Sequence, residues 1–74
     1  MPKEITIGSK IIIEINGQIK NLQIVGSADV DVNHGKISYL SPIGESLLGR
    51  KVGEIVEVKL ANGKVIKTRI VKIY

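Results

Sequence analysis

Two Asn-Gly dipeptides, at residues 16–17 and 62–63, constrain the fold of this chain more than any other feature. Each one separates two runs that are rich in isoleucine and valine, and the first lies between residues 9–15 and 18–25. Asn and Gly are the residues that best tolerate the positive φ that a type I′ turn requires, so Asn-Gly between apolar runs is typical of an antiparallel hairpin. The sequence therefore predicts two hairpins, one near each end of the chain.

Between the hairpins, the sequence predicts a short strand over residues 36–39 and a short helix over residues 42–48. Ser41 is a good N-cap, and Pro42 fits the first helical position because no backbone donor is needed there. Gly49 fits the position after the helix, where the backbone is often left-handed. A helix of about two turns is not stable alone, so we expect it to pack on the sheet.

The second hairpin should consist of strands over residues 54–60 and 64–73. In the last strand the alternation places Ile73 on the face opposite Ile70, and its irregularity indicates a bulge or a strong twist. The predicted architecture is one antiparallel sheet of about five strands with one helix across a face, which is the α+β class. Residues 1–8 are predicted to be a loosely held lead-in, and residues 9–74 a single domain.

Length and composition exclude several classes of protein. The chain has 74 residues, enough for one small domain, and it has no Cys, which excludes disulfides and thiolate metal sites. No apolar run approaches the roughly 20 residues that a membrane-spanning helix needs, and no signal peptide is recognisable. We therefore expect a soluble, cytoplasmic protein that does not bind membranes.

The net charge of +4 is unevenly distributed, because residues 50–74 hold seven of the eleven basic side chains. A basic segment can attract nucleic acid, and the candidate phosphate contacts are Lys64, Lys67, Arg69 and Lys72. Base stacking has little support, because the chain has two Tyr and neither Phe nor Trp. The alternative is a solvated strand face whose lysines protect a sheet edge.

The segment of residues 26–35 holds the side chains most suggestive of chemistry. Asp29, Asp31 and His34 lack the spacing of a calcium or zinc loop, and a solvated polar loop is the simpler interpretation. A triad of Ser41, His34 and Asp29 can be drawn, but nothing in the sequence marks a nucleophile elbow. We therefore predict no enzyme activity and no metal or other cofactor.

Six short motifs occur in one order along the chain. They are Ile24-Val25-Gly26, Ala28-Asp29, Ile37-Ser38, Ser41-Pro42-Ile43, Leu48-Gly49-Arg50-Lys51-Val52-Gly53 and the turn at Asn62-Gly63. In this order and at these separations they resemble the C-terminal domain of the GreA/GreB transcript-cleavage factors, over roughly residues 8–74. One departure is Ser27, which stands where the family usually has an acidic residue.

The resemblance implies an FKBP-like fold and a function in transcription elongation. In the family, the cleavage chemistry belongs to an N-terminal coiled coil that this sequence does not contain, so no catalytic residues carry over. The C-terminal domain docks at the rim of the secondary channel of bacterial RNA polymerase, on its largest subunit. The residues that the resemblance marks as polymerase contacts are Ala28, Asp29, Ser38, Ser41, Pro42 and Ile43. Prolyl isomerase activity, which the fold also suggests, is disfavoured by the lack of Phe and Trp.

Two hypotheses follow. The first is a stand-alone, non-catalytic module that docks on RNA polymerase and modulates elongation. The second is a small basic domain that binds nucleic acid weakly through its last hairpin. A fragment of a longer factor is a further interpretation, and exposed sheet edges would permit a homodimer.

Overall fold

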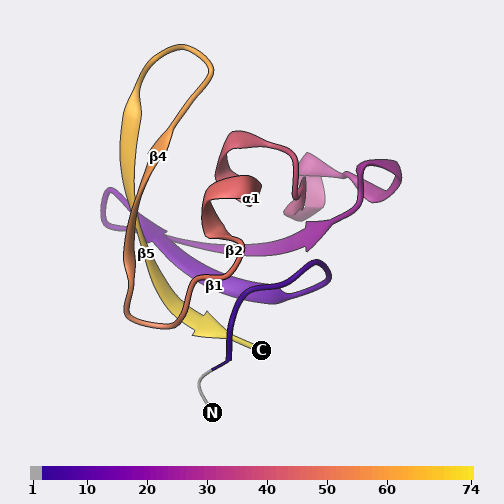
Figure 1. Cartoon of the computed structure of the whole chain (residues 1–74), viewed down its shortest axis with the longest axis horizontal. Helices are drawn as coiled ribbons and strands as arrows, with labels where there is room; N and C mark the ends of the chain where they lie inside the picture. Colours follow the sequence, from indigo (N-terminus) through magenta and orange to yellow (C-terminus); the bar gives the residue numbers. More distant parts are fainter. Residues whose placement is uncertain (1–2) are drawn as a thin grey trace.

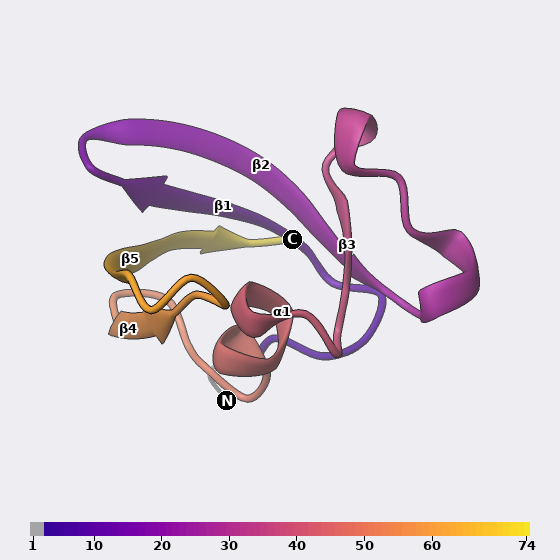
Figure 2. The same ribbon diagram turned by 90° about the horizontal axis from the view of Figure 1, so that it is seen from above.

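The computed structural model describes residues 3–74, which form five strands and one helix. Their order is β1 (Lys10–Ile15), β2 (Gln18–Val25), β3 (Lys36–Ser38), α1 (Pro42–Leu47), β4 (Ile55–Lys59) and β5 (Val65–Ile73), with two short 3-10 turns, η1 (Ser27–Asp29) and η2 (Val32–His34), before β3. The strands form one sheet in the order β3-β2-β1-β5-β4. The sheet curls around α1, which packs against the two edge strands, β3 and β4 (Figures 1 and 2). The predicted α+β class is therefore confirmed.

Both predicted hairpins are present, but they use different turns. Asn16 and Gly17 have φ of 51° and 80°, as a type I′ turn requires. In the second hairpin only Gly63 has a positive φ, and the amide of Leu60 donates to the carbonyl oxygen of Lys64 at 2.7 Å. That pairing leaves a three-residue loop with a single left-handed residue, which is the next most common hairpin connection.

The prediction of a wholly antiparallel sheet is wrong at one edge, because β3 pairs parallel to β2. Gln23 pairs with Lys36, and Val25 pairs with Ser38. A parallel partner requires the chain to cross back before it pairs. Residues 26–35, which contain η1 and η2, bring the chain from Val25 at the end of β2 back to Gln23, where β3 begins to pair (Figure 2).

A bulge in β5 changes which side chains reach the concave face of the sheet. The register with β1 shifts between Ile12, which faces Lys72, and Ile13, which faces Ile70, so that Val71 is the extra residue. This confirms the predicted irregularity. It also corrects the predicted faces, because Ile73 and Ile70 both become buried on the concave side.

The core lies between the concave face and α1, and most of its buried side chains are branched and aliphatic. They are Ile5, Ile11, Ile13, Ile24, Leu47, Val56, Val58, Ile70 and Ile73. Thr68 is buried among them, and its hydroxyl has no hydrogen-bond partner in the described part of the chain.

The lead-in predicted over residues 1–8 begins with two residues that lie outside the described part, and the rest of it is not loosely held. Ile5 is only 1% exposed. Its amide donates to the carbonyl oxygen of Arg50 at 2.9 Å, and its own carbonyl accepts from the amide of Gly49 at 2.8 Å. This segment therefore closes one end of the core beside the C-terminal end of α1. Among residues 3–74, no helix has the length and apolar character needed to span a membrane.

Candidate functional site

The chain turns sharply from β3 into α1, and residues 38–44 form what we call the β3–α1 corner. Ser41 caps the helix, because its Oγ accepts from the amide of Gly44 at 3.1 Å. The same Oγ donates to the carbonyl oxygen of Ser38 at 2.7 Å, and the Ser41 amide donates to that oxygen at 3.0 Å. Pro42 occupies the first helical turn, as the sequence predicts. The corner is thus held by interlocking hydrogen bonds.

Gly44 makes this corner possible. It is buried in the first turn of α1, and a Cβ added there would overlap the carbonyl oxygen of Ser38. Sequence reasoning missed this role. The available signal was a glycine inside a very short helix, where it is unfavourable unless another backbone approaches closely.

The six predicted polymerase contacts fall into two neighbouring groups. Ser38, Ser41, Pro42 and Ile43 all lie within the β3–α1 corner, whereas Ala28 and Asp29 lie on η1, which contacts β3. Ala28, Asp29 and Pro42 are exposed. Ile43 is half-buried and packs against the core.

Leu40 is a corner residue that sequence reasoning also missed. The residue is 62% exposed, and its amide donates to the Oγ of Ser38 at 3.0 Å. An exposed leucine on a backbone fixed in this way resembles the apolar anchors of protein interfaces. Single exposed apolar residues are common on protein surfaces, so exposure alone does not assign a role.

The acidic and histidine side chains of residues 26–35 form one pair. His34 Nδ1 lies 2.6 Å from Asp31 Oδ2, and both side chains are substantially exposed. Asp29 is not part of this contact. In the described residues, no three His, Cys, Asp or Glu side chains gather in a group that could hold a metal ion. The Ser41 hydroxyl is engaged in the helix cap, so the drawn triad is not assembled.

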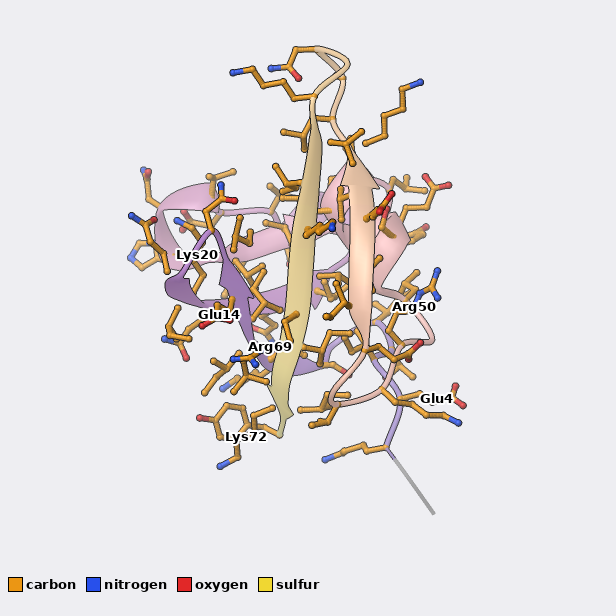
Figure 3. All side chains as sticks on the ribbon, turned by 90° about the vertical axis from the view of Figure 1, so that its left-hand side faces the viewer. Glu4, Glu14, Lys20, Arg50, Arg69 and Lys72 are labelled. Atoms are coloured by element: carbon orange, nitrogen blue, oxygen red, sulfur yellow. The ribbon has the colours of Figure 1, made fainter. Side chains whose placement is uncertain are left out.

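The four basic candidates of the nucleic-acid alternative lie on the second hairpin. Lys64 borders its loop, and Arg69 and Lys72 project from the convex face of β5 (Figure 3). Lys67 lies two residues before Arg69 in the same strand and therefore shares that face. Arg69 Nη2 lies 3.0 Å from Glu14 Oε1, and Lys67 pairs across the strands with Glu57. Two of these cations therefore have carboxylate neighbours, which weakens their attraction for phosphate.

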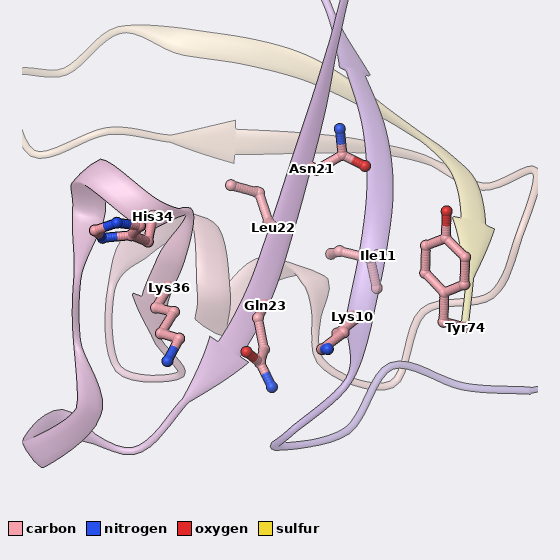
Figure 4. Close-up of a pocket in the computed structure, with 8 residues that line it drawn as sticks. All are labelled: Lys10, Ile11, Asn21, Leu22, Gln23, His34, Lys36 and Tyr74. Atoms are coloured by element: carbon pink, nitrogen blue, oxygen red, sulfur yellow. The ribbon is translucent and has the colours of Figure 1, made fainter.

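A shallow pocket of about 320 Å³ opens on the convex face, at the end of the sheet opposite the loop of the second hairpin (Figure 4). Its walls come from β1, β2, η2 and β3 together with Tyr74. The lining residues are Lys10, Ile11, Asn21, Leu22, Gln23, His34, Lys36 and Tyr74. We refer to it below as the convex pocket.

Comparison with known proteins gives one consistent family. A family described as "Transcription elongation factor, GreA/GreB, C-term" matches residues 1–74. The transcription elongation factor GreA of Thermomicrobium roseum is 42% identical over 59 residues, which cover 80% of this chain and 38% of the relative. That of Macrococcus caseolyticus is 44% identical over 72 residues, covering 95% and 46%. The chain therefore spans less than half the length of these curated relatives.

Solved structures agree with the sequence relatives. GreA factor homolog 1 (Gfh1) of Thermus thermophilus matches 99% of this chain and 49% of its own, with a TM-score of 0.83 and 31% identity. A GreA/GreB factor from Nitrosomonas europaea matches 99% of this chain and 62% of its own, with a TM-score of 0.78 and 32% identity.

Proposed function

This chain belongs to the family of GreA/GreB C-terminal domains, which are parts of transcription elongation factors, and on that premise we propose that it docks on bacterial RNA polymerase without performing catalysis. The docking place that we propose is the rim of the secondary channel, on the largest subunit, where bound protein would modulate elongation. RNA polymerase would be met in the cytoplasm.

The observation that carries the proposal is the β3–α1 corner. Its backbone is fixed by the bonds of Ser38, Ser41 and Gly44, while Leu40 and Pro42 remain exposed. A surface that is already ordered loses little conformational freedom on binding, which favours affinity. Asp29 on the neighbouring η1 adds an exposed carboxylate that could pair with a basic residue of the partner.

Ile43 has a different part in this proposal. Because it packs against the core, it supports the corner from beneath in addition to any contact with polymerase. Ile43→Asp would place a charge against apolar neighbours and would weaken folding as well as docking. A clean test needs exposed residues instead.

The test is retention of bacterial RNA polymerase core enzyme by the tagged chain, with and without an excess of full-length GreA as competitor. Leu40→Asp and Asp29→Lys should each reduce retention about tenfold or more, since both change the exposed part of the surface. The matched control is Val52→Asp, because Val52 is also in a turn and is 55% exposed. Equal retention of all three variants, or no retention of the parent chain at low salt, would refute the docking surface.

The absence of catalysis is a separate part of the proposal. It is supported by the engagement of the Ser41 hydroxyl in the helix cap and by the exposure of the Asp31–His34 pair. The chain added to stalled elongation complexes should release no cleaved transcript, while full-length GreA in the same assay does. Cleavage by the purified chain would overturn this part alone.

Nucleic-acid binding through the second hairpin remains the alternative function. Lys64, Lys67, Arg69 and Lys72 could contact phosphates, but Glu14 and Glu57 lie beside two of them. We therefore rank this alternative below docking. Charge reversal at Lys67 and Arg69 should abolish binding to DNA at low salt under this alternative, and leave polymerase retention unchanged.

A further inference from the structure

A row of three polar side chains crosses three strands at the convex pocket. Gln23 of β2 pairs with Lys36 of β3 on one side and with Lys10 of β1 on the other. Residues directly opposite each other in a sheet project from the same face. Figure 4 shows the two ammonium groups on either side of the Gln23 side chain. Asn21, two residues earlier on β2, adds a second amide to the same pocket.

The charge at this pocket is positive and unneutralised. In the described part of the chain, neither Lys10 nor Lys36 has a carboxylate within 4.0 Å. Along the chain, the acid nearest to Lys10 is Glu14, which is paired with Arg69 at 3.0 Å. The acid nearest to Lys36 is Asp31, whose backbone pairs with Lys36 and whose Oδ2 lies 2.6 Å from His34 Nδ1. These lysines therefore differ from Arg69, whose guanidinium is paired with Glu14.

Tyr74 borders the same pocket and supplies an aromatic ring. Its amide donates to the carbonyl oxygen of Lys10 at 2.9 Å, which holds the residue beside β1. The residue is 55% exposed, and Lys72 Nζ lies 4.6 Å from the ring centroid. Lysines and amides beside an aromatic ring are the groups that bind the phosphates and bases of unpaired nucleic acid.

We propose that the convex pocket binds single-stranded nucleic acid. Lys10 and Lys36 contact backbone phosphates, Gln23 and Asn21 donate to phosphate or base oxygens, and one base stacks on Tyr74. A single strand is favoured over a duplex because only an unpaired base exposes a free face to the ring. The volume of about 320 Å³ is at the lower end for ligand pockets and suits a single nucleotide unit of the strand. The pocket is on the opposite face from α1, so this proposal does not depend on docking.

The experiment is fluorescence anisotropy with a fluorescein-labelled eight-nucleotide oligouridylate at low salt. The double variant Lys10→Glu/Lys36→Glu should bind about tenfold more weakly or worse, with a shallower salt dependence. The double variant Lys64→Glu/Lys67→Glu is the matched control, because it changes the net charge equally on the second hairpin. It should bind within about twofold of the parent chain.

Two further arms test the stacked base. Tyr74→Ala should weaken binding about fivefold or more, whereas Tyr74→Phe should retain it, because the ring and not the hydroxyl makes the contact. A labelled duplex of the same length should bind more weakly than the single strand. Equal losses in the two double variants, stronger loss in the control, or tighter binding of the duplex would each overturn the proposal, as would no binding by the parent chain.

Discussion

The two faces of the sheet come from the same strands but carry different kinds of side chain. The concave face meets α1, buries branched aliphatic side chains and ends in the β3–α1 corner, where Gly44 leaves no room for a methyl group. The convex face carries lysines, amides and ion pairs such as Arg69–Glu14, all at least partly exposed. Substitutions of the buried residues on the concave side should therefore change stability, and those of exposed residues, at the corner or on the convex face, should change binding.

The largest effect is expected from Gly44→Ala. The new methyl group would overlap the Ser38 carbonyl, so α1 must shift or its cap must break, at a cost of about 3 kcal/mol or more. A domain of this size has a total stability of roughly 4–11 kcal/mol, so much of the protein would unfold on mild heating. Urea denaturation measures the change.

The matched control for this substitution is Gly26→Ala. Gly26 has a φ of −72°, and an added Cβ would meet no atom of the described residues within 4 Å. This variant should be neutral or more stable by roughly 0.4–1 kcal/mol. Similar losses in both variants would mean that the corner is not unusually tight.

The next largest change in stability is expected at Leu47 in α1, in contrast to Leu40, which lies just before the helix. Leu47 is fully buried, and Leu47→Ala should lower the free energy of unfolding by about 2–5 kcal/mol because it leaves a cavity. Leu40→Ala should change it by less than about 0.5 kcal/mol, because Leu40 is 62% exposed. A large loss at Leu40 would show that it belongs to the core and not to a docking surface.

Thr68→Val, on the concave face, is expected to increase the stability of the protein. Among residues 3–74 the Thr68 hydroxyl is buried without a hydrogen-bond partner, and valine has nearly the same shape, so stability should rise by about 1 kcal/mol. Thr68→Ser retains the hydroxyl and removes the methyl group, and it should lower stability. A shift in thermal midpoint measured by circular dichroism distinguishes the two, and a loss with valine would indicate a bound water.

The smallest effect is expected on the convex face, at the pair of Arg69 and Glu14. A double-mutant cycle with alanine at both positions should give a coupling of about 0.2–1 kcal/mol that decreases with added salt, because the Arg69 side chain is 54% exposed. A larger, salt-independent coupling would mean that the convex face also contributes strongly to stability.

The turns and caps that depend only on residues close together in the chain could be predicted from the sequence. The Asn16-Gly17 turn has the predicted positive φ values, and Ser41 caps α1 as expected. The dipeptide at Asn62-Gly63 predicts a hairpin, but it does not determine the turn type, because the neighbouring strand register decides how many residues the loop contains.

The features that sequence reasoning missed depend on contacts between distant residues. A three-residue strand carries no signal for its direction, so the parallel pairing of β3 was not predictable. The row of Lys10, Gln23 and Lys36 depends on that pairing, and the convex pocket was therefore missed. The role of Ile5 was missed because one apolar residue in a short lead-in shows no periodicity.

The strand order has a consequence for how the protein folds. The centre of the sheet is the pair of β1 and β5, where Ile15 faces Thr68 and Ile11 faces Ile73. Each hairpin can close locally, but this pair must bring together segments separated by about 50 residues, which carries a larger entropy penalty. We therefore expect that closure of β1 against β5 limits the folding rate. Until it closes, both hairpins expose apolar faces to solvent, and the chain is most prone to aggregate during that interval.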